Sequence, residues 1–306
     1  MIKKYLVDIK NNNLFLLYIW NEYCRFRFKL DYLINSERKS IEKQYKRFSG
    51  NSLNLDNPTL FSEKLQYLKI NNRDRYLTRC VDKVEVRNVL QELGYSHYLN
   101  EIYCYFDDVN KIDFTKLPDK FVLKGAHGSG WNFICHDKNK ANWSLLKLVF
   151  KSWLKQNIYF NGREWPYKNC KPRILVEKYL EDEYGELRDY KFHCFNGEPK
   201  FIQVNAGRFS SKPVQNFYDT SWNVQSYGKT IDPDMDIFIP PPENIQEMLV
   251  VSRELSKKFD YVRVDFYEVK GSIVFGELTF YPASGMPDFT EKGIDEIWGE
   301  LLTLSK

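Results

Sequence analysis

The chain has 306 residues, of which 43% are hydrophobic and 28% are charged. This composition excludes an intrinsically disordered protein, and the length is enough for one large domain or two modest ones. The formal net charge of +4 is too small to predict a nucleic-acid-binding protein. No apolar run approaches the roughly 20 residues that a membrane-spanning helix needs.

The six cysteines are scattered along the chain, and no two of them form a CxxC pair. This spacing argues against a zinc site and against a disulfide framework, and it is typical of reduced, buried thiols. The first residues are basic, but the asparagines and charges that follow do not fit a signal peptide. We therefore expect a cytoplasmic protein.

Residues 1–50 are predicted to form a basic, helical N-terminal extension. An apolar run from Leu14 to Trp20 is followed by Arg25, Arg27 and Lys29, which alternate with apolar residues. Two interpretations stay open. The extension is either packed on the body of the protein, or it is an interfacial amphipathic helix that contacts anionic lipid at the inner face of the membrane.

Two further helices are predicted before residue 115. Pro58 and Thr59 suit the start of the first, and Asp82 to Leu93 forms the second, which ends at Gly94. Lys83 and Arg87 are four residues apart and therefore share one face of that second helix. A solvent-exposed face is the alternative to a binding role.

A lysine and a glycine-rich loop follow the predicted buried strand over 121–123. Lys124 ends this strand, and the next residues contain Gly125, Gly128 and Gly130. Glycine allows backbone N–H groups to converge on an anion, and Lys124 adds a positive charge. The glycine spacing fits neither a P-loop nor the dinucleotide-binding fingerprint. The loop thus predicts phosphate binding, with a plain turn as the alternative.

The middle of the chain alternates between helices and strands. We predict a helix around 144–156, a strand over 173–180, two strands within 189–205 joined at Asn196-Gly197, and an amphipathic helix over 243–258. Acidic residues follow the 173–180 strand, namely Asp182, Glu183 and Glu186.

The last predicted hairpin carries two carboxylates, Asp265 and Glu277, in the middle of strands that are otherwise largely apolar. A half-buried carboxylate is unfavourable unless it is paired or binds a cation. Mg²⁺ takes one or two protein carboxylates together with water and substrate phosphates. The sequence therefore predicts a magnesium site, with an ion pair to Arg263 as the structural alternative.

The turn at Lys270-Gly271 makes the metal prediction specific. A two-residue turn alone would place Asp265 opposite Gly276, and Glu277 would then face the other side of the sheet. An odd-length loop or a β-bulge brings both acids to one face. We therefore predict one of these two irregularities in this hairpin.

The ordered set of these segments resembles the ATP-grasp superfamily, and within it the TupA-like branch, which is linked to teichuronopeptide and other surface-polysaccharide synthesis. The similar segments lie between about residues 55 and 290 and leave residues 1–50 outside. They include Asn57-Pro58 to Lys64, Asp82-Lys83, residues 117–124 and 127–130, Gly162-Arg163-Glu164-Trp165, residues 176–180, 189–192 and 218–219, and Arg263 to Phe266 with Glu277 to Pro282.

The resemblance implies ATP and one or two Mg²⁺ ions as cofactors. Phosphates would be held by Lys124, Arg87, Lys83 and the loop residues Gly128, Ser129 and Gly130. Adenine would meet the backbone of Lys178, Tyr179 and Leu180, with Glu177 on its amino edge, and Glu183 or a neighbouring acid would take the ribose. The metal would be held by Asp265, Glu277 and Thr279. Superfamily members often have Asn at this last position, and a neutral hydroxyl is the weaker ligand.

The implied fold is α+β, an ATP-grasp fold whose two mixed or antiparallel sheet lobes clasp a nucleotide, preceded by the helical extension. We expect a helical region over 51–115, a small lobe over 116–180 and a large lobe over 181–306. Catalytic candidates are Arg263, Arg208, Lys191 and His127.

The implied reaction is an ATP-dependent carboxylate–amine ligation through an acyl phosphate. It would join a uronic-acid carboxyl of a bacterial surface glycan or its precursor to an amino acid or another amine. The alternatives are a glycosyltransferase of the same pathway, for which Asp232-Pro233-Asp234 has the spelling of a metal motif, and a non-catalytic nucleotide-binding module.

Overall fold

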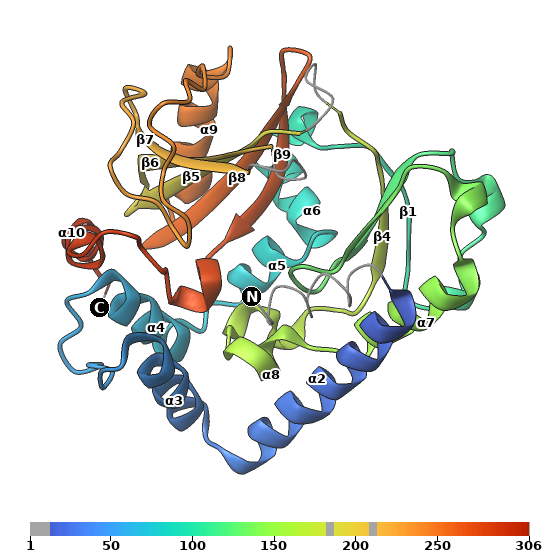
Figure 1. Ribbon diagram of the computed structural model, residues 1–306, viewed down its shortest axis with the longest axis horizontal. Helices are drawn as coiled ribbons and strands as arrows, with labels where there is room; N and C mark the ends of the chain where they lie inside the picture. Colours follow the sequence, from blue (N-terminus) through green and yellow to red (C-terminus); the bar gives the residue numbers. More distant parts are fainter. Residues whose placement is uncertain (1–12, 182–186, 208–212, 306) are drawn as a thin grey trace. The chain divides into compact units, whose positions relative to one another are not determined.

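The computed structural model describes residues 13–181, 187–207 and 213–305 (Figure 1). By its internal contacts the chain divides into two compact units that interleave along the sequence. Unit 1 comprises Met1–Ile41, Arg73–Ser96 and Asn100–Tyr179, and unit 2 comprises Glu42–Asn72, His97–Leu99 and Leu180–Lys306. Each unit is described here by itself.

Unit 1 is built on a four-stranded antiparallel sheet with the order β1-β4-β2-β3. One face of this sheet is apolar and packs on α7, so that Phe121, Leu123 and Val176 are buried with Phe150 and Trp153. The opposite face carries the polar side chains of the same strands. The strands are β1 (Ile102–Phe106), β2 (Phe121–Gly125), β3 (Asn132–Cys135) and β4 (Ile174–Lys178).

The helices of unit 1 enclose its core. They are α2 (Leu14–Ile34), α5 (Tyr76–Val81), α6 (Glu85–Glu92), α7 (Trp143–Leu154) and α8 (Ile158–Gly162), with α3 (Glu37–Ser49) crossing into unit 2. The long helix α2 packs on α7 and α8 (Figure 1). Helix α6 ends before Gly94, whose φ of +83° favours glycine. It begins at Glu85, three residues later than predicted.

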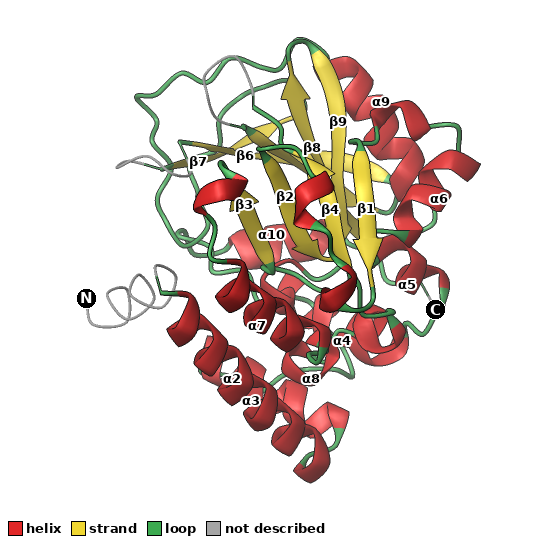
Figure 2. Ribbon diagram, turned by 90° about the vertical axis from the view of Figure 1, so that its right-hand side faces the viewer, coloured by secondary structure: helices red, strands yellow, loops and turns green. Residues whose placement is uncertain are grey.

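Unit 2 is built on a five-stranded antiparallel sheet with the order β7-β6-β5-β8-β9 (Figure 2). Helix α9 (Ile245–Ser256) packs on β5, β6 and β8 and buries one face, which includes Phe192, Val264 and Ile202. The strands are β5 (Asp189–Phe195), β6 (Glu198–Ala206), β7 (Val214–Asp219), β8 (Tyr261–Val269) and β9 (Ser272–Thr279).

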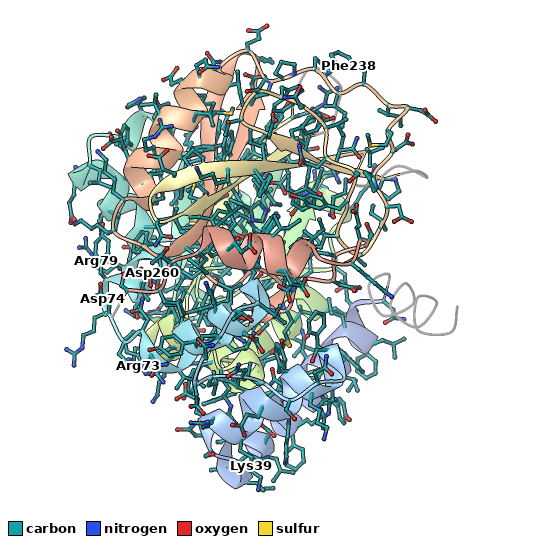
Figure 3. All side chains as sticks on the ribbon, turned by 90° about the vertical axis from the view of Figure 1, so that its left-hand side faces the viewer. Lys39, Arg73, Asp74, Arg79, Phe238 and Asp260 are labelled. Atoms are coloured by element: carbon teal, nitrogen blue, oxygen red, sulfur yellow. The ribbon has the colours of Figure 1, made fainter. Side chains whose placement is uncertain are left out.

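An aromatic cluster joins the remaining helices of unit 2, α4 (Phe61–Asn71) and α10 (Ile294–Leu301), to the sheet. The indole of Trp298 stacks on Phe201 at 5.0 Å and meets Phe61 edge-on at 5.2 Å. The segment before α9 is irregular and exposed, and Phe238 within it is 79% exposed (Figure 3).

The β8–β9 hairpin confirms the predicted β-bulge. Its turn has two residues, Lys270 and Gly271, with φ of 51° and 69°, so Val269 pairs with Ser272. The register then shifts between Asp265 and Phe266, and Asp265 pairs directly with Glu277. The extra residue is Gly276, where a Cβ would lie 3.0 Å from the Asp265 carbonyl oxygen.

The α+β fold class predicted from the sequence is confirmed, as is the hairpin at Asn196-Gly197. Three strands, β1, β3 and β7, were not predicted. All six cysteines are free thiols, as expected. None of the helices in the described part of the chain has the length and hydropathy of a membrane span.

Candidate functional site

The polar face of the unit 1 sheet brings Lys124 and Glu177 together. Lys124 lies on β2 and Glu177 on β4, and the Lys124 Nζ is 2.7 Å from the Glu177 Oε2. Both side chains are largely buried, at 22% and 12% exposure, so this ion pair is better shielded than a surface pair. A phosphate that binds Lys124 must compete with Glu177.

Arg87 contributes a second cation to this face. Burial lowers its pKa, and the charge of Glu177 acts in the opposite direction. Its guanidinium donates to the Asn100 carbonyl at 2.9 Å. Glu177, which was expected at the adenine amino group, therefore interacts electrostatically with both predicted phosphate-binding cations, Lys124 and Arg87.

Lys83 contacts the backbone of the glycine loop. Its Nζ donates to the Gly128 carbonyl at 2.8 Å, and its backbone N–H donates to the Ala126 carbonyl at 3.0 Å. The preceding residue, Asp82, accepts two bonds of 2.8 Å from the buried guanidinium of Arg173. Lys83 thus connects the start of α6 to the loop.

Two glycines of the loop are required by the indole of Trp131. A Cβ at Gly128 would lie 2.3 Å from the Trp131 ring, and one at Gly125 would lie 2.8 Å from it. Residues 125–128 are buried, whereas Ser129 and Gly130 are exposed at the tip. The loop is therefore packed around Trp131, and the part of it that is open to a ligand is its tip.

His127 is buried within this loop, with 2% exposure. One ring nitrogen, Nε2, donates to the Trp153 carbonyl at 3.0 Å, and Nδ1 accepts from the Arg173 N–H at 3.3 Å. Burial lowers the pKa of the ring. With both nitrogens engaged by the backbone, His127 serves packing in this structure, and its placement lends no support to the predicted role as a catalytic base.

The predicted adenine hinge begins at Lys178, whose backbone groups are already paired. Its N–H donates to the Glu101 carbonyl at 3.0 Å, and its carbonyl accepts from the Asn100 amide at 2.9 Å. Adenine contacts would therefore fall to the backbone of Tyr179 and Leu180.

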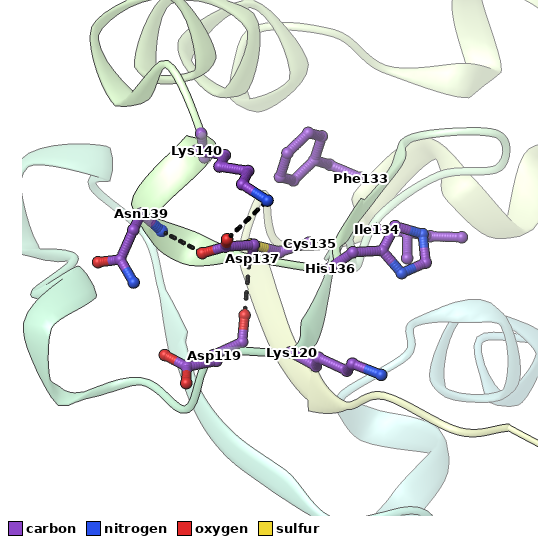
Figure 4. A pocket seen from close by; sticks show the side chains of 10 residues that line it. Asp119, Lys120, Phe133, Ile134, Cys135, His136, Asp137, Asn139 and Lys140 are labelled. Atoms are coloured by element: carbon purple, nitrogen blue, oxygen red, sulfur yellow. Dashed lines mark hydrogen bonds and ion pairs between the residues drawn. The ribbon is translucent and has the colours of Figure 1, made fainter.

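A shallow pocket of about 650 Å³ opens beside strand β3 of unit 1 (Figure 4). Tyr179 contacts two of its lining residues. Its ring centroid lies 5.3 Å from that of His136 and 5.7 Å from the Lys120 Nζ. The pocket contains neither Lys124 nor Glu177, so it is separate from the phosphate-binding group. Its lining residues are Asp119, Lys120, Phe133, Ile134, Cys135, His136, Asp137, Asn139, Lys140 and Ala141.

The second group of site residues lies on the face of the unit 2 sheet opposite α9. Lys191 on β5 pairs with Asp265 on β8, which in turn pairs with Glu277 on β9. Residues two positions apart share a face, so Arg263 and Thr279 extend this group along their strands. The predicted shared face of Asp265 and Glu277 is confirmed, and Lys191, Arg263 and Thr279 lie on the same face.

Arg263 and Asp265 form a buried, bidentate ion pair, with two N–O distances of 2.6 Å. Burial lowers the pKa of Arg263, but the charge of Asp265 outweighs it and the net shift is upward. The Lys191 Nζ lies 2.7 Å from Asp265 and 2.5 Å from Asp189. The ion pair of Asp265 with Arg263, which the sequence offered as the alternative to a magnesium site, is therefore present.

The donor set fits Mg²⁺. Asp265 and Glu277 supply hard oxygen atoms from one face, and the Thr279 hydroxyl lies 3.1 Å from the Glu277 carboxylate. The side chain of Glu277 is 33% exposed, and Asp265 Oδ1 accepts only one of the bonds described here. Among the described residues there is no group of three or more His, Cys, Asp or Glu that could hold a metal ion.

Lys229 is a residue of this face that the sequence did not predict. Burial, together with the positive charges of Arg263 and Lys191, lowers its pKa from 10.5 to about 8. It follows Gly228, where a Cβ would lie 2.1 Å from the Ile231 carbonyl oxygen, so the turn requires glycine. In the sequence, the Gly228-Lys229 pair is the one feature that could have pointed to this residue, and it lies in a segment that was predicted to be irregular.

Other candidate residues have less to contribute. Glu183 and Arg208 lie outside the described residues. His193 is buried, and its Nδ1 is 2.7 Å from the Tyr261 hydroxyl, as expected for a packed histidine. Asp232 and Asp234 are exposed, and the backbone of Asp234 is paired with Asn216, so the motif of the glycosyltransferase alternative is a surface turn.

Each of the two antiparallel sheets carries part of the predicted site: Lys124 and Glu177 lie on one, and Lys191, Asp265 and Glu277 lie on the other. This is the arrangement that the resemblance to ATP-grasp proteins predicts. A family model described as TupA-like ATP-grasp matches residues 63–303. The chain therefore belongs to the TupA-like ATP-grasp family, which confirms the resemblance seen in the sequence and supports the predicted enzyme class, an ATP-grasp ligase.

Solved structures that are similar to this chain are remote. The D-alanine–D-alanine ligase from Bacillus anthracis has 17% identity and a TM-score of 0.40, over 71% of this chain and 57% of that one. The ligase of the same name from Helicobacter pylori has 10% identity and a TM-score of 0.42, over 79% and 69%. The ATP-grasp ligase PsnB, complexed with minimal precursor, Mg and ADP, has 11% identity and a TM-score of 0.39, over 72% of this chain and 57% of that one. The chain thus spans less than two thirds of the Bacillus ligase, and no curated protein matches it.

A double-mutant cycle tests the packing of the glycine loop. Gly128→Ala places a methyl group against the Trp131 ring, and overpacking of this kind destabilises by about 1–3 kcal/mol. In a Trp131→Ala background the same substitution should cost much less, as measured by urea unfolding. Gly130→Ala is the control, because its Cβ would meet nothing and its cost should not depend on Trp131. Equal costs of Gly128→Ala in both backgrounds would contradict the packing.

The lowered pKa of Lys229 predicts a pH-dependent stability difference. Between pH 8 and pH 10.5 the unfolded chain binds the proton that folded Lys229 lacks, so stability rises with pH in this window. Lys229→Met removes this slope. The difference in free energy of unfolding between the variant and the wild type should therefore be larger at pH 8 and below than at pH 10.5, by up to about 3 kcal/mol in favour of the variant. Urea unfolding from pH 7 to 10 in EDTA measures this difference. Lys116→Met, at an exposed position, should show none, and a parallel pH dependence of Lys229→Met and wild type would refute the shift.

Proposed function

We propose that this protein is an ATP-dependent carboxylate–amine ligase that acts through an acyl phosphate. The observation that carries the proposal is the pairing of Asp265 with Glu277 across the β-bulge, with Arg263 and Lys191 on the same face. Membership of the TupA-like ATP-grasp family supports it.

In the proposed reaction a carboxylate oxygen of the acceptor attacks the γ-phosphorus of ATP, and ADP leaves. The amine nitrogen then attacks the acyl carbon, the amine loses a proton and phosphate leaves. Phosphoryl transfer requires mainly positioning and stabilisation of charge. The residues of this chain that supply these functions are cations and carboxylates.

Lys124 and Arg87 would bind ATP phosphates, and Ser129 and Gly130 at the tip of the loop would offer backbone N–H groups. In the structure Lys124 is paired with Glu177. We propose that Glu177 is released from Lys124 when phosphate binds and then accepts from the adenine amino group. Tyr179 and Leu180 would provide the backbone contacts to adenine, and Glu183 would take the ribose.

Asp265 and Glu277, with Thr279 beside them, would hold Mg²⁺, which when bound neutralises charge on the phosphates. Arg263 lies against Asp265 and would bind the substrate carboxylate or the developing acyl phosphate, because a guanidinium matches two oxygens at once. Arg208 would assist in the same role. Lys191, held between Asp189 and Asp265, would lie near the phosphates.

The substrate proposal rests on the family. We propose that the carboxylate is a uronic acid of a bacterial surface glycan or its precursor, that the amine is an amino acid or another amine, and that the reaction takes place in the cytoplasm. Aromatic residues are abundant, at 16%, and would give stacking surfaces for a sugar.

Hydroxylamine trapping tests this function without knowledge of the natural amine. Protein incubated with Mg-ATP, glucuronate or galacturonate, and hydroxylamine should yield a hydroxamate together with equal amounts of ADP and phosphate. Lys124→Ala and Glu277→Ala should each lower the rate at least about 100-fold, since Lys124 would offset phosphate charge directly and Glu277 would do so through the Mg²⁺ that it holds.

Matched controls are Lys116→Ala and Glu300→Ala, which remove exposed charges from the same two units and should keep full activity. Circular dichroism checks that every variant is folded. Hydrolysis of a UDP-sugar in place of ATP turnover would support the glycosyltransferase. Nucleotide binding without turnover of any uronate would support a non-catalytic module.

A further inference from the structure

Helix α2 leaves one face exposed that is almost entirely apolar. Its side chains reach 68% exposure at Phe26, 70% at Leu33 and 69% at Ile34. At 100° per residue, nine of the ten exposed apolar residues of α2, all but Tyr32, fall within an arc of about 140°. They are Phe15, Leu16, Ile19, Trp20, Tyr23, Phe26, Leu30, Leu33 and Ile34. An apolar surface of this kind, continuous along a 21-residue helix, marks an interaction site.

The opposite face of α2 is fixed to unit 1 by specific contacts. Asn21 is buried and donates to the Ser152 hydroxyl of α7 at 3.0 Å. The buried guanidinium of Arg163 lies 2.8 Å from Asp31 and stacks over the Tyr32 ring at 5.1 Å. Because these polar contacts fix the rotation of the helix about its axis, the apolar arc stays on the outside.

Positive charge accompanies this face. By the same helical geometry Arg27 lies at one edge of the arc and Lys29 beyond the other edge. Arg38 and Lys39 follow at the start of α3, and Figure 3 labels Lys39. Residues 1–50 contain 11 Lys and Arg against 5 Asp and Glu, a net charge of +6, so the remaining 256 residues carry −2. The basic charge of the chain is therefore confined to the segment that carries the apolar face.

The composition of the arc matches the interface of a bilayer. Trp20 and Tyr23 combine an apolar ring with a polar group, the type that is enriched at the headgroup level. The helix does not have the hydropathy of a membrane span. The inner face of α2 packs Leu14, Leu17 and Tyr18 on the core of unit 1, so the outer face, which is apolar with a basic edge, is the one that could lie on the membrane surface.

We propose that the exposed face of α2 docks on anionic lipid, with Phe15, Ile19, Phe26, Leu30 and Leu33 inserted among the acyl chains and Arg27 and Lys29 at the headgroups. The packed interpretation of the N-terminal extension holds for α2, which lies on α7 and α8, and the proposal adds the interfacial interpretation for its outer face. The proposal is independent of the ligase reaction.

Vesicle cosedimentation of the full-length protein tests this proposal. Wild type should bind vesicles of phosphatidylcholine with 30% phosphatidylglycerol at least tenfold more tightly than pure phosphatidylcholine, and 0.5 M salt should weaken the binding. Ile19→Glu/Phe26→Glu/Leu33→Glu should lose at least tenfold in affinity. The matched control is Ile231→Glu/Ile237→Glu/Phe238→Glu, which adds three carboxylates at exposed apolar positions of unit 2 and should bind more tightly than the α2 variant.

A second readout separates insertion from surface attachment. Brominated acyl chains should quench part of the tryptophan fluorescence of wild type, and Trp20→Phe should remove that part. Equal binding by the two triple variants, or no binding of wild type to anionic vesicles, would overturn the proposal. It would also be overturned if light scattering showed a dimer that the α2 triple variant dissociates, because a second copy would then occupy the face.

Discussion

The buried ion pair between Arg263 and Asp265 is the interaction on which the unit 2 site depends. On a desolvated face of a sheet, removal of one partner leaves an uncompensated charge, at a cost of about 3–5 kcal/mol. Lys191 and Asp189 extend the pair, and Glu277 joins it only because the bulge at Gly276 restores the alternation of β9. A single extra residue in one strand therefore decides whether the second carboxylate faces its partners or the opposite side of the sheet.

The site residues of unit 1 follow a different constraint, which is steric. The glycines at 125 and 128 leave room for the ring of Trp131, while Lys83 binds the Gly128 carbonyl. The loop is therefore packed over most of its length, and the groups free to meet a ligand are confined to Ser129, Gly130 and the side chains of the neighbouring strands. Competition between Glu177 and a phosphate for Lys124 would couple nucleotide binding to a rearrangement of this sheet face. Arg163, inside the family match, binds Asp31 in the helix outside it, so α2 is held by a residue of the matched region of unit 1.

Much of this arrangement could be predicted from the sequence, because strand alternation and turn chemistry are local properties. Because side chains alternate between the faces of a strand, a two-residue turn at Lys270-Gly271 puts Asp265 and Glu277 on one face only if a β-bulge lies between them. The bulge is present. The contact between Gly128 and Trp131 could not be predicted, because the sequence does not distinguish a glycine that makes room for a neighbouring side chain from one that lets the backbone bind an anion. Lys229 was missed because its environment is made by Arg263 and Lys191, which are distant in sequence. His127 looked available within a glycine loop, and only the fold shows that Trp153 and Arg173 use its nitrogens.

The proposed function requires that the protein bind a magnesium nucleotide. Calorimetric titration of the folded protein with a non-hydrolysable ATP analogue in the presence of Mg²⁺ tests it most directly. The account predicts one site per chain, weakened at least tenfold by Lys124→Ala in unit 1 and by Glu277→Gln in unit 2, and unchanged by Lys116→Ala. Absence of binding to folded wild-type protein, or binding that is insensitive to either of the first two substitutions, would contradict it.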